Sequence, residues 1–168
     1  MKIALIGYMA SGKSVIGRKL ASNISLEFID LDAYIELKEK KTISEIFSTK
    51  GEIYFRLKES EYLEELLHSK NSFVLSLGGG TPCYGKNLEI IKSLTTSIYL
   101  KASIPTLCKR LVIERNSRPL VATISDEKLP EFVGKHLFER APFYERAETI
   151  ISTDTLSINE VVDVILKA

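Results

Sequence analysis

The chain has 168 residues, of which 45% are hydrophobic and 27% charged, and its formal net charge is +1. This size and composition predict a single domain with a substantial core. The near-neutral charge creates no global field for nucleic acid or an anionic membrane, so any anion recognition must come from locally placed cations. Two cysteines, Cys83 and Cys108, are too few for a disulfide framework, and we expect reduced thiols in a cytoplasmic protein. We expect no signal peptide or membrane span, because the first apolar run ends after four residues.

Short apolar strands and amphipathic helices alternate along the first half of the chain. We expect strands at residues 2–6, 26–29 and 73–77, and helices at residues 12–22, 31–40, 42–47 and 51–70. Thr42 is a candidate N-cap, because Glu45 follows it by three residues. In the long fourth helix, the apolar stripe is expected to comprise Leu57, Leu63, Leu66 and Leu67.

The second half continues the same alternation. We expect strands at residues 97–100 and 149–151, helices at residues 87–94, 104–113, 131–144 and 158–166, and an irregular segment at residues 116–130 with two prolines. Five apolar strands separated by helices predict an α/β three-layer sandwich with a five-stranded parallel sheet. Ligands in such sheets bind at the carboxyl ends of the strands.

A phosphate-binding loop is predicted directly after the first strand. Residues 7–14 read GYMASGKS and match the pattern G-x-x-x-x-G-K-[ST] between a predicted strand and a predicted helix. Backbone N–H groups of such a loop surround phosphates, and the helix adds its positive N-terminal end. Lys13 would reach the β and γ phosphates, and the Ser14 hydroxyl would bind Mg²⁺.

Two acids, Asp30 and Asp32, come immediately after the second strand. One could hold Mg²⁺ through water, since this ion takes few protein carboxylates. The other could accept a hydrogen bond from a substrate hydroxyl and orient it. The alternative is an N-cap aspartate followed by a solvated acid in the first helical turn.

Three glycines, Gly78 to Gly80, follow the third strand, where a tight turn would need only one or two. They indicate close approach of a ligand to bare backbone. No aspartate ends this strand, and Ser76 is either an indirect partner of the metal or a plain strand residue. Arg56, Arg118 and Arg140 offer guanidinium groups suited to carboxylates and phosphates, and the Arg118-Pro119 pair suggests a mobile lid.

These motifs in this order, GYMASGKS, IDLD, GEIYFR, LSLGGG, SRPL and ERAPFYE, make the sequence resemble the shikimate kinase family over essentially the whole chain. The resemblance implies a P-loop fold like that of nucleoside monophosphate kinases, as one domain over residues 1–168 with a substrate-binding region at about 31–60 and a lid at about 110–126. It also implies phosphorylation of the 3-hydroxyl of shikimate by MgATP, in aromatic amino acid biosynthesis. We expect a cytoplasmic monomer whose partners are ATP and shikimate, with no nucleic acid or membrane.

The resemblance also implies roles for individual residues. The ATP-binding residues would be Ala10, Ser11, Gly12, Lys13, Ser14, Val15 and Arg118, with Arg110 near the adenine. Shikimate would contact Asp32, Arg56, Gly78, Gly79, Gly80 and Arg140. Ser14 and Asp30 would hold Mg²⁺, Asp30 through water. The catalytic residues would be Lys13, Asp32 and Arg118, with Asp32 binding the ring hydroxyls and serving as base.

Two residues depart from the usual family pattern. Ala10 stands where glycine is usual, so the loop must use an ordinary backbone angle there or carry strain, and Val15 stands where threonine is common. Two rival functions follow from the residues alone. A gluconate or nucleoside monophosphate kinase would share the fold, although a nucleotide acceptor would require aromatic or amide groups to read its base. A slowly hydrolysing nucleotide switch would require an exposed partner surface, which the sequence does not indicate.

Overall fold

The computed structural model describes all residues from 1 to 168, and it confirms the predicted five-stranded parallel sheet. The strand order is β2-β3-β1-β4-β5. The strands are β1 (Lys2–Ile6), β2 (Glu27–Asp30), β3 (Phe73–Ser76), β4 (Thr96–Lys101) and β5 (Thr149–Ser152). In the register, Ser76 is opposite Asp30 on one side and Leu5 on the other, so the segments after β1, β2 and β3 begin at one edge of the sheet.

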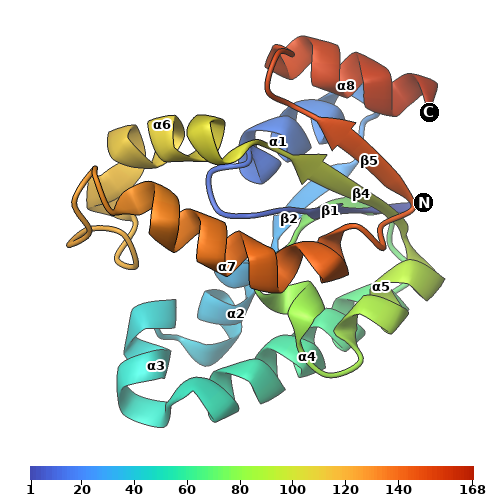
Figure 1. Cartoon of the computed structure of the whole chain (residues 1–168). Coiled ribbons are helices and arrows are strands. Elements are labelled where there is room, and N and C mark those ends of the chain that lie inside the picture. Colours follow the sequence, from blue (N-terminus) through green and yellow to red (C-terminus); the bar gives the residue numbers. More distant parts are fainter.

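Helices cover both faces of this sheet (Figure 1). They are α1 (Lys13–Asn23), α2 (Leu31–Glu39), α3 (Ile43–Lys50), α4 (Glu52–His68), α5 (Asn87–Leu94), α6 (Ile104–Glu114), α7 (Leu129–Tyr144) and α8 (Ile158–Lys167), with short 3₁₀ turns η1 (Thr81–Cys83) and η2 (Arg115–Ser117). Helices α1 and α8 lie together on one side of the sheet, and α4, α5 and α7 lie on the other. The two chain termini lie at the end of the molecule opposite to α3 and the loop before α7 (Figure 1).

Two hydrophobic cores form because side chains alternate between the faces of a strand. On β1, Ala4 and Ile6 belong to the core shared with α4, α5 and α7, whereas Ile3 and Leu5 belong to the core under α1 and α8. The central strand is therefore apolar and buried from Ile3 to Ile6, as expected for a strand that is covered on both faces. This rigid centre carries the loop that follows Ile6.

Most predicted elements are confirmed, and two assignments need correction. Thr42 caps α3, because its hydroxyl accepts a hydrogen bond from the Glu45 amide at 3.1 Å. Pro130 was assigned to the irregular segment but lies in the first turn of α7, where its missing N–H has no helical acceptor to lose.

Leu57 was assigned to the apolar stripe of α4 but is 66% exposed. The buried stripe instead begins at Phe55 and continues through Glu59, at a spacing of four residues.

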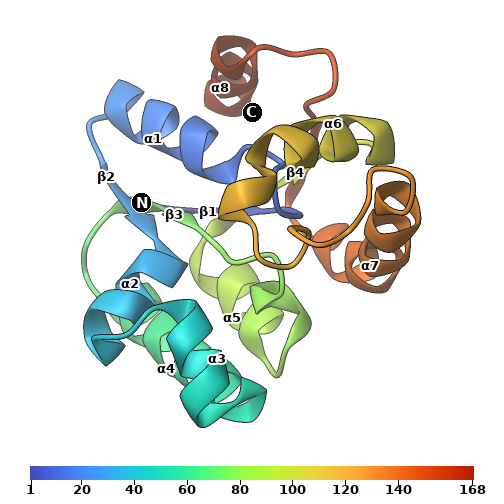
Figure 2. The same ribbon diagram turned by 90° about the vertical axis from the view of Figure 1, so that its left-hand side faces the viewer.

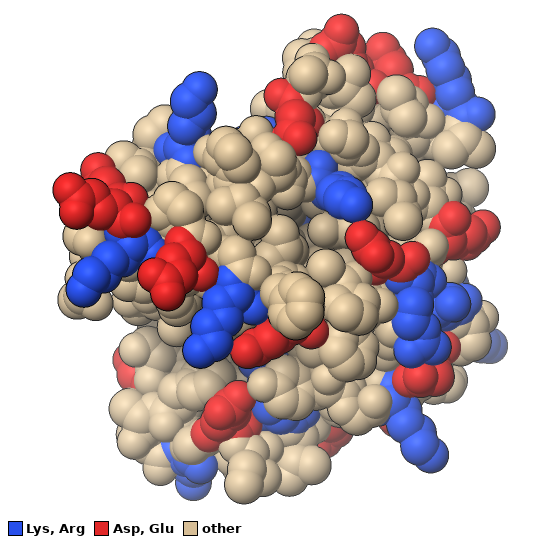
Figure 3. All heavy atoms as spheres, in the orientation of Figure 1, with Lys and Arg blue, Asp and Glu red and all other residues tan.

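The surface carries charges of both signs. On the face shown in Figure 3, Lys and Arg side chains are interspersed with Asp and Glu side chains. No helix of the structure combines the length and the apolar character needed to span a membrane.

Candidate active site

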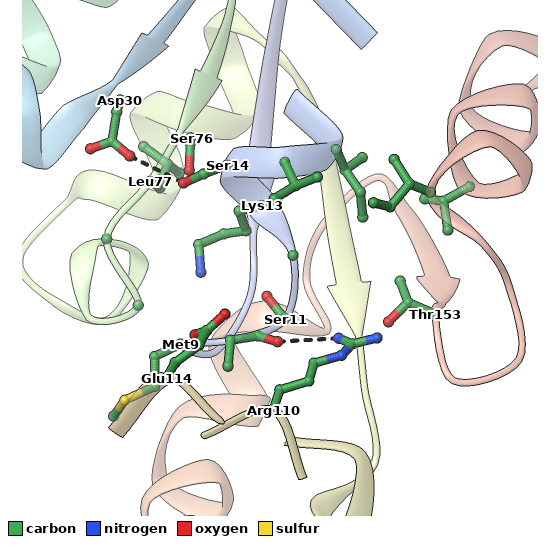
Figure 4. A pocket seen from close by; sticks show the side chains of 18 of the residues that line it. Met9, Ser11, Lys13, Ser14, Asp30, Ser76, Leu77, Arg110, Glu114 and Thr153 are labelled. Carbon is green, nitrogen blue, oxygen red and sulfur yellow. Dashed lines mark hydrogen bonds between the residues drawn. The ribbon is translucent and has the colours of Figure 1, made fainter. Parts of the chain in front are cut away.

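A cavity of about 370 Å³ lies at the carboxyl ends of the strands, between α1 and the segment that follows α6. Figure 2 views the molecule from this end, and Figure 4 shows the cavity from close by. Its lining includes most of the sequence-predicted site residues: Ala10, Ser11, Gly12, Lys13, Ser14, Val15, Asp30, Asp32, Gly78, Gly79, Arg110 and Arg118. Arg56, Gly80 and Arg140 do not line it, but Arg140 lies against Gly79 and Arg56 lies against Gly80.

The loop between β1 and α1 adopts a tight, partly strained conformation. Gly12 precedes α1 with a φ of 97°, which glycine tolerates, but Ala10 has a φ of 63°. Ala10 therefore carries strain, since a left-handed angle costs an L-residue roughly 1–2 kcal/mol. The Arg110 guanidinium donates a hydrogen bond to the Ala10 carbonyl at 3.1 Å and so helps to hold this angle. Figure 4 shows Arg110 reaching the loop from the side opposite Ser14.

Lys13 is folded across the inside of the loop. Its Nζ donates to the carbonyl oxygens of Gly7 at 2.8 Å and of Tyr8 at 3.0 Å. Burial lowers the pKa of Lys13 to about 8, and the nearby charge of Arg118 acts in the same direction. The protein therefore neutralises the positive charge of this ammonium group only in part, so a multivalent anion in the cavity would bind to it favourably.

Asp30 makes two contacts at once, and its interpretation as an N-cap is confirmed. Its Oδ1 accepts a hydrogen bond from the Ala33 amide at 3.1 Å, which makes it the N-cap of α2. Its Oδ2 accepts one from the Ser14 hydroxyl at 3.3 Å. Ser76 is buried and lines the cavity beside this pair. The cap fixes the carboxylate, so that its second oxygen faces the phosphate loop (Figure 4).

Asp32 is not a solvated acid. Its carboxylate faces the glycine triplet, because a Cβ added to Gly78 would lie 3.2 Å from Asp32 Oδ1. Burial, together with the negative charges of Asp30 and Glu59, raises the pKa of Asp32 to about 6 against the opposing charge of Lys13. A carboxyl group with a pKa near neutrality can accept a proton from a substrate more readily than an ordinary aspartate.

The glycine triplet leaves space for two arginine side chains. A Cβ added to Gly79 would lie 2.9 Å from Arg140 Nη1, and one added to Gly80 would lie 2.7 Å from Arg56 Nη2. Both distances are shorter than a van der Waals contact, so a side chain at either position would displace a guanidinium group. The triplet thus brings Asp32, Arg56 and Arg140 to one short stretch of backbone.

Arg56 is held in place by groups that the sequence reading missed. Its Nη1 donates to Glu59 at 2.8 Å, and its guanidinium lies 4.0 Å from the centre of the Tyr84 ring. Glu59 is only 1% exposed, and its other oxygen accepts a hydrogen bond from the Thr81 hydroxyl at 2.8 Å. In the sequence, this ion pair was indicated only by the three-residue spacing of Arg56 and Glu59 on one helix. Many surface pairs have the same spacing.

Arg118 and Arg110 both line the cavity from the region of α6. Arg118 is paired with Glu114, whose carboxylate also lines the cavity and was not among the predicted residues. Val15 lines the cavity mouth and is 55% exposed. The two cysteines are unpaired and partly buried, and neither lines the cavity.

The parallel sheet, the glycine-rich loop between β1 and α1 and the acids after β2 define a P-loop protein with the fold of nucleoside monophosphate kinases. The family model described as shikimate kinase matches residues 9–168. The chain therefore belongs to the shikimate kinase family.

Individual relatives agree with this assignment. A shikimate kinase from Flavobacterium psychrophilum is 47% identical over 167 residues, which are 99% of this chain and 97% of the relative. The crystal structure of shikimate kinase from Bacteroides thetaiotaomicron superposes with a TM-score of 0.92 at 34% identity, covering 99% of this chain and 97% of that chain. Shikimate kinase from Acinetobacter baumannii in complex with shikimate gives a TM-score of 0.88 at 33% identity, covering 99% and 90% of the two chains.

Proposed function

We propose that this chain transfers the γ-phosphoryl group of ATP to the 3-hydroxyl of shikimate, giving shikimate 3-phosphate and ADP, in the synthesis of chorismate and aromatic amino acids. The observation that carries the proposal is the convergence of Asp32, Arg56 and Arg140 on the glycine triplet, next to a phosphate loop. The family membership supports the same reaction. We further propose that the protein acts as a cytoplasmic monomer.

The acceptor would be recognised at both ends. Arg56 and Arg140 would bind the carboxylate, since paired guanidinium groups suit a planar anion. Gly78, Gly79 and Gly80 would let the ring approach the backbone, and Asp32 would accept a hydrogen bond from a ring hydroxyl. Arg56 is pre-positioned for this role by Glu59, which limits the entropy that binding would otherwise cost.

The phosphoryl transfer would depend on positioning and on charge compensation. The acceptor oxygen forms a bond to the γ-phosphorus while the bond from that phosphorus to the bridging oxygen of ADP breaks, and the hydroxyl proton passes to Asp32. Lys13 and Arg118 would stabilise the charge on the transferring group. Ser14 and Asp30 are hard oxygen ligands that lie within 3.3 Å of each other beside the loop, a donor set that fits Mg²⁺. When bound there, Mg²⁺ would neutralise charge on the β and γ phosphates.

The nucleotide would occupy the phosphate loop, with Ala10, Ser11, Gly12, Lys13, Ser14 and Val15 around its phosphates, and Arg110 beside the adenine. We propose that residues 31–60 form the substrate-binding region and residues 110–126 a lid that closes over ATP. Hydrogen exchange tests the lid: amides of this segment should exchange faster than those of α7 in the free protein and slow when ATP and acceptor are added together. Uniformly slow exchange without ligand would contradict it.

An acceptor panel tests the reaction itself. ADP release with Mg²⁺ and ATP should depend on shikimate, whereas gluconate and nucleoside monophosphates should stimulate it little. Gluconate lacks a rigid ring. A nucleotide acceptor would need an aromatic or amide group to read its base, but the aromatic ring of Tyr84 is already occupied by the Arg56 guanidinium. Equal ADP release with and without shikimate, together with strong stimulation by another acceptor, would overturn the assignment.

A further inference from the structure

The phosphate loop is joined to α7 by a contact between residues 128 positions apart. The hydroxyl of Tyr8 lies 3.0 Å from Nδ1 of His136. The two rings meet edge to face, with centroids 5.4 Å apart and an interplanar angle of 89°. Tyr8 is 1% exposed, so its hydroxyl must find a protein partner, and His136 is the partner that the fold provides.

Tyr8 connects this contact to the lysine of the loop. Its backbone carbonyl accepts a hydrogen bond from Lys13 Nζ at 3.0 Å, while its side chain extends to His136. Burial raises the pKa of Tyr8 to about 12, so the hydroxyl keeps its proton at neutral pH. Burial, followed by the charge of Arg140, lowers the pKa of His136, so the imidazole is neutral there and Nδ1 can accept a hydrogen bond.

His136 also lies on the face of α7 that reaches the glycine triplet. His136, Arg140 and Tyr144 are spaced by four residues and therefore share one face of the helix. Arg140 lies against Gly79, and the Tyr144 hydroxyl donates to the Gly79 carbonyl at 2.5 Å. The same helix face thus contacts the phosphate loop at one end and the triplet at the other.

We propose that His136 is a positioning residue that, through Tyr8, fixes the phosphate loop relative to Arg140, so that nucleotide and acceptor are held in line. The proposal rests on the function proposed above, because it assigns ATP to the loop and the acceptor to Arg140. Phosphoryl transfer depends on alignment of the two substrates. A small misalignment of the nucleotide and the acceptor therefore lowers turnover more than it lowers the binding of either substrate alone.

The experiment compares four variants with the wild type: Tyr8→Phe, His136→Phe, both together, and His136→Asn. Phenylalanine keeps the ring and removes the bonding atom, whereas the asparagine side chain places an oxygen close to the position of Nδ1. Each phenylalanine variant should lower kcat by about three- to tenfold, the value of one ordinary hydrogen bond. The calorimetric affinities for ATP alone and acceptor alone should change less than about twofold. The double variant should be no slower than the single ones, because both remove the same bond.

His136→Asn separates positioning from simple packing, and it should recover most of the wild-type kcat. His68→Phe is the matched control, because His68 is exposed on α4 and bonds only to its own helix; its kcat should equal that of the wild type. Additive losses in the double variant, an unchanged kcat in the single variants, or a His136→Asn variant as slow as His136→Phe would overturn the proposal. Turnover is measured with whichever acceptor the wild type accepts, so failure with shikimate would count only against the proposed function.

Discussion

Arg118 is bound by a carboxylate from its own segment: its Nη2 and Nε lie 3.0 and 3.2 Å from the same oxygen of Glu114, four residues earlier. Both side chains are partly exposed, at 38% and 42%, so the pair is worth little on its own. Glu114 also lines the cavity, so if ATP binds there as proposed, its negative charge would repel the triphosphate and compete with it for Arg118. ATP binding would then have to break the weak ion pair between Glu114 and Arg118.

We accordingly expect Glu114→Gln to lower the KM for ATP by roughly two- to fivefold, up to the value of an exposed ion pair, without a loss of kcat. Steady-state kinetics at low ionic strength would show the effect, and added salt should reduce it. Glu127→Gln removes an exposed acid from the segment between α6 and α7 and is the control. A drop in kcat for Glu114→Gln would mean instead that Glu114 holds Arg118 in its productive orientation.

Replacing Ala10 with glycine should relieve strain in the phosphate loop. With Ala10 at a φ of 63°, we expect Ala10→Gly to raise the free energy of unfolding by about 0.5–1 kcal/mol, because the relieved strain exceeds the entropy that glycine adds to the unfolded chain. Lys40→Gly is a matched control, since Lys40 has a φ of 56° at the exposed end of α2. Chemical denaturation would measure both variants. Destabilisation by Ala10→Gly alone would show that the loop depends on the alanine side chain.

The activity should depend on two perturbed groups and give a bell-shaped pH profile. Asp32, with a pKa of about 6, must be ionised to accept the hydroxyl proton, so kcat/KM for the acceptor should fall below about pH 6. Lys13, with a pKa of about 8, must be protonated to bind phosphate, so kcat/KM for ATP should fall above about pH 8. Saturating ATP should shift the alkaline limb of kcat upward, because the triphosphate favours the charged lysine. Flat profiles from pH 5 to 9 would exclude these roles.

Ionisation of Asp32, which should favour activity, should lower the stability of the fold. Its pKa is raised from 3.8 to about 6, so between these values the folded state holds a proton that the unfolded chain does not. The stabilisation from this group is complete below about pH 4 and is lost as the pH rises through 6. Asp32→Asn should therefore raise the melting temperature at pH 7 by roughly a few degrees while it removes most of the activity. A lower melting temperature would contradict the buried setting of this carboxylate.

The sequence predicted the sheet and the phosphate loop because these signals are local. The apolar runs at residues 2–6 and 73–77, the flanking glycines and the spacing of Lys13 and Ser14 are each visible within a few residues. The resemblance of the ordered motifs to a known family then supplied the function and the site residues, most of which line one cavity.

The sequence could not predict the contacts that hold those residues in place. Glu59 reads as one more charge on a polar helix, and its burial depends on how α4 packs against η1. The pairing of Tyr8 with His136 depends on the position of α7 relative to a loop 128 residues earlier. Alanine permits several backbone angles, so the strain at Ala10 could be named only as an alternative.

The two arginines beside the glycine triplet should be separable from the phosphate loop by mutation. If Arg56 and Arg140 bind the acceptor carboxylate, replacing either with alanine should weaken acceptor binding by about tenfold or more, because charge-assisted hydrogen bonds are worth roughly 1.5–3 kcal/mol. ATP affinity should change little. Lysine should rescue only partly, since it lacks the planar fork. Calorimetric titration of each substrate into each variant measures these effects.

Arg56→Ala and Arg140→Ala should differ in stability. This difference helps to distinguish a loss of acceptor binding caused by unfolding from one caused by the missing guanidinium group. Arg56→Ala leaves the buried carboxylate of Glu59 without its cation and should cost about 3 kcal/mol in unfolding free energy. Arg140 forms no ion pair in the structure, so Arg140→Ala should cost much less. Arg56→Ala combined with Glu59→Gln should regain stability but not acceptor affinity. An acceptor whose carboxylate is reduced to an alcohol should bind the wild type poorly and be nearly indifferent to both arginine variants. If ATP affinity fell as much as acceptor affinity in Arg140→Ala, the carboxylate assignment would be wrong.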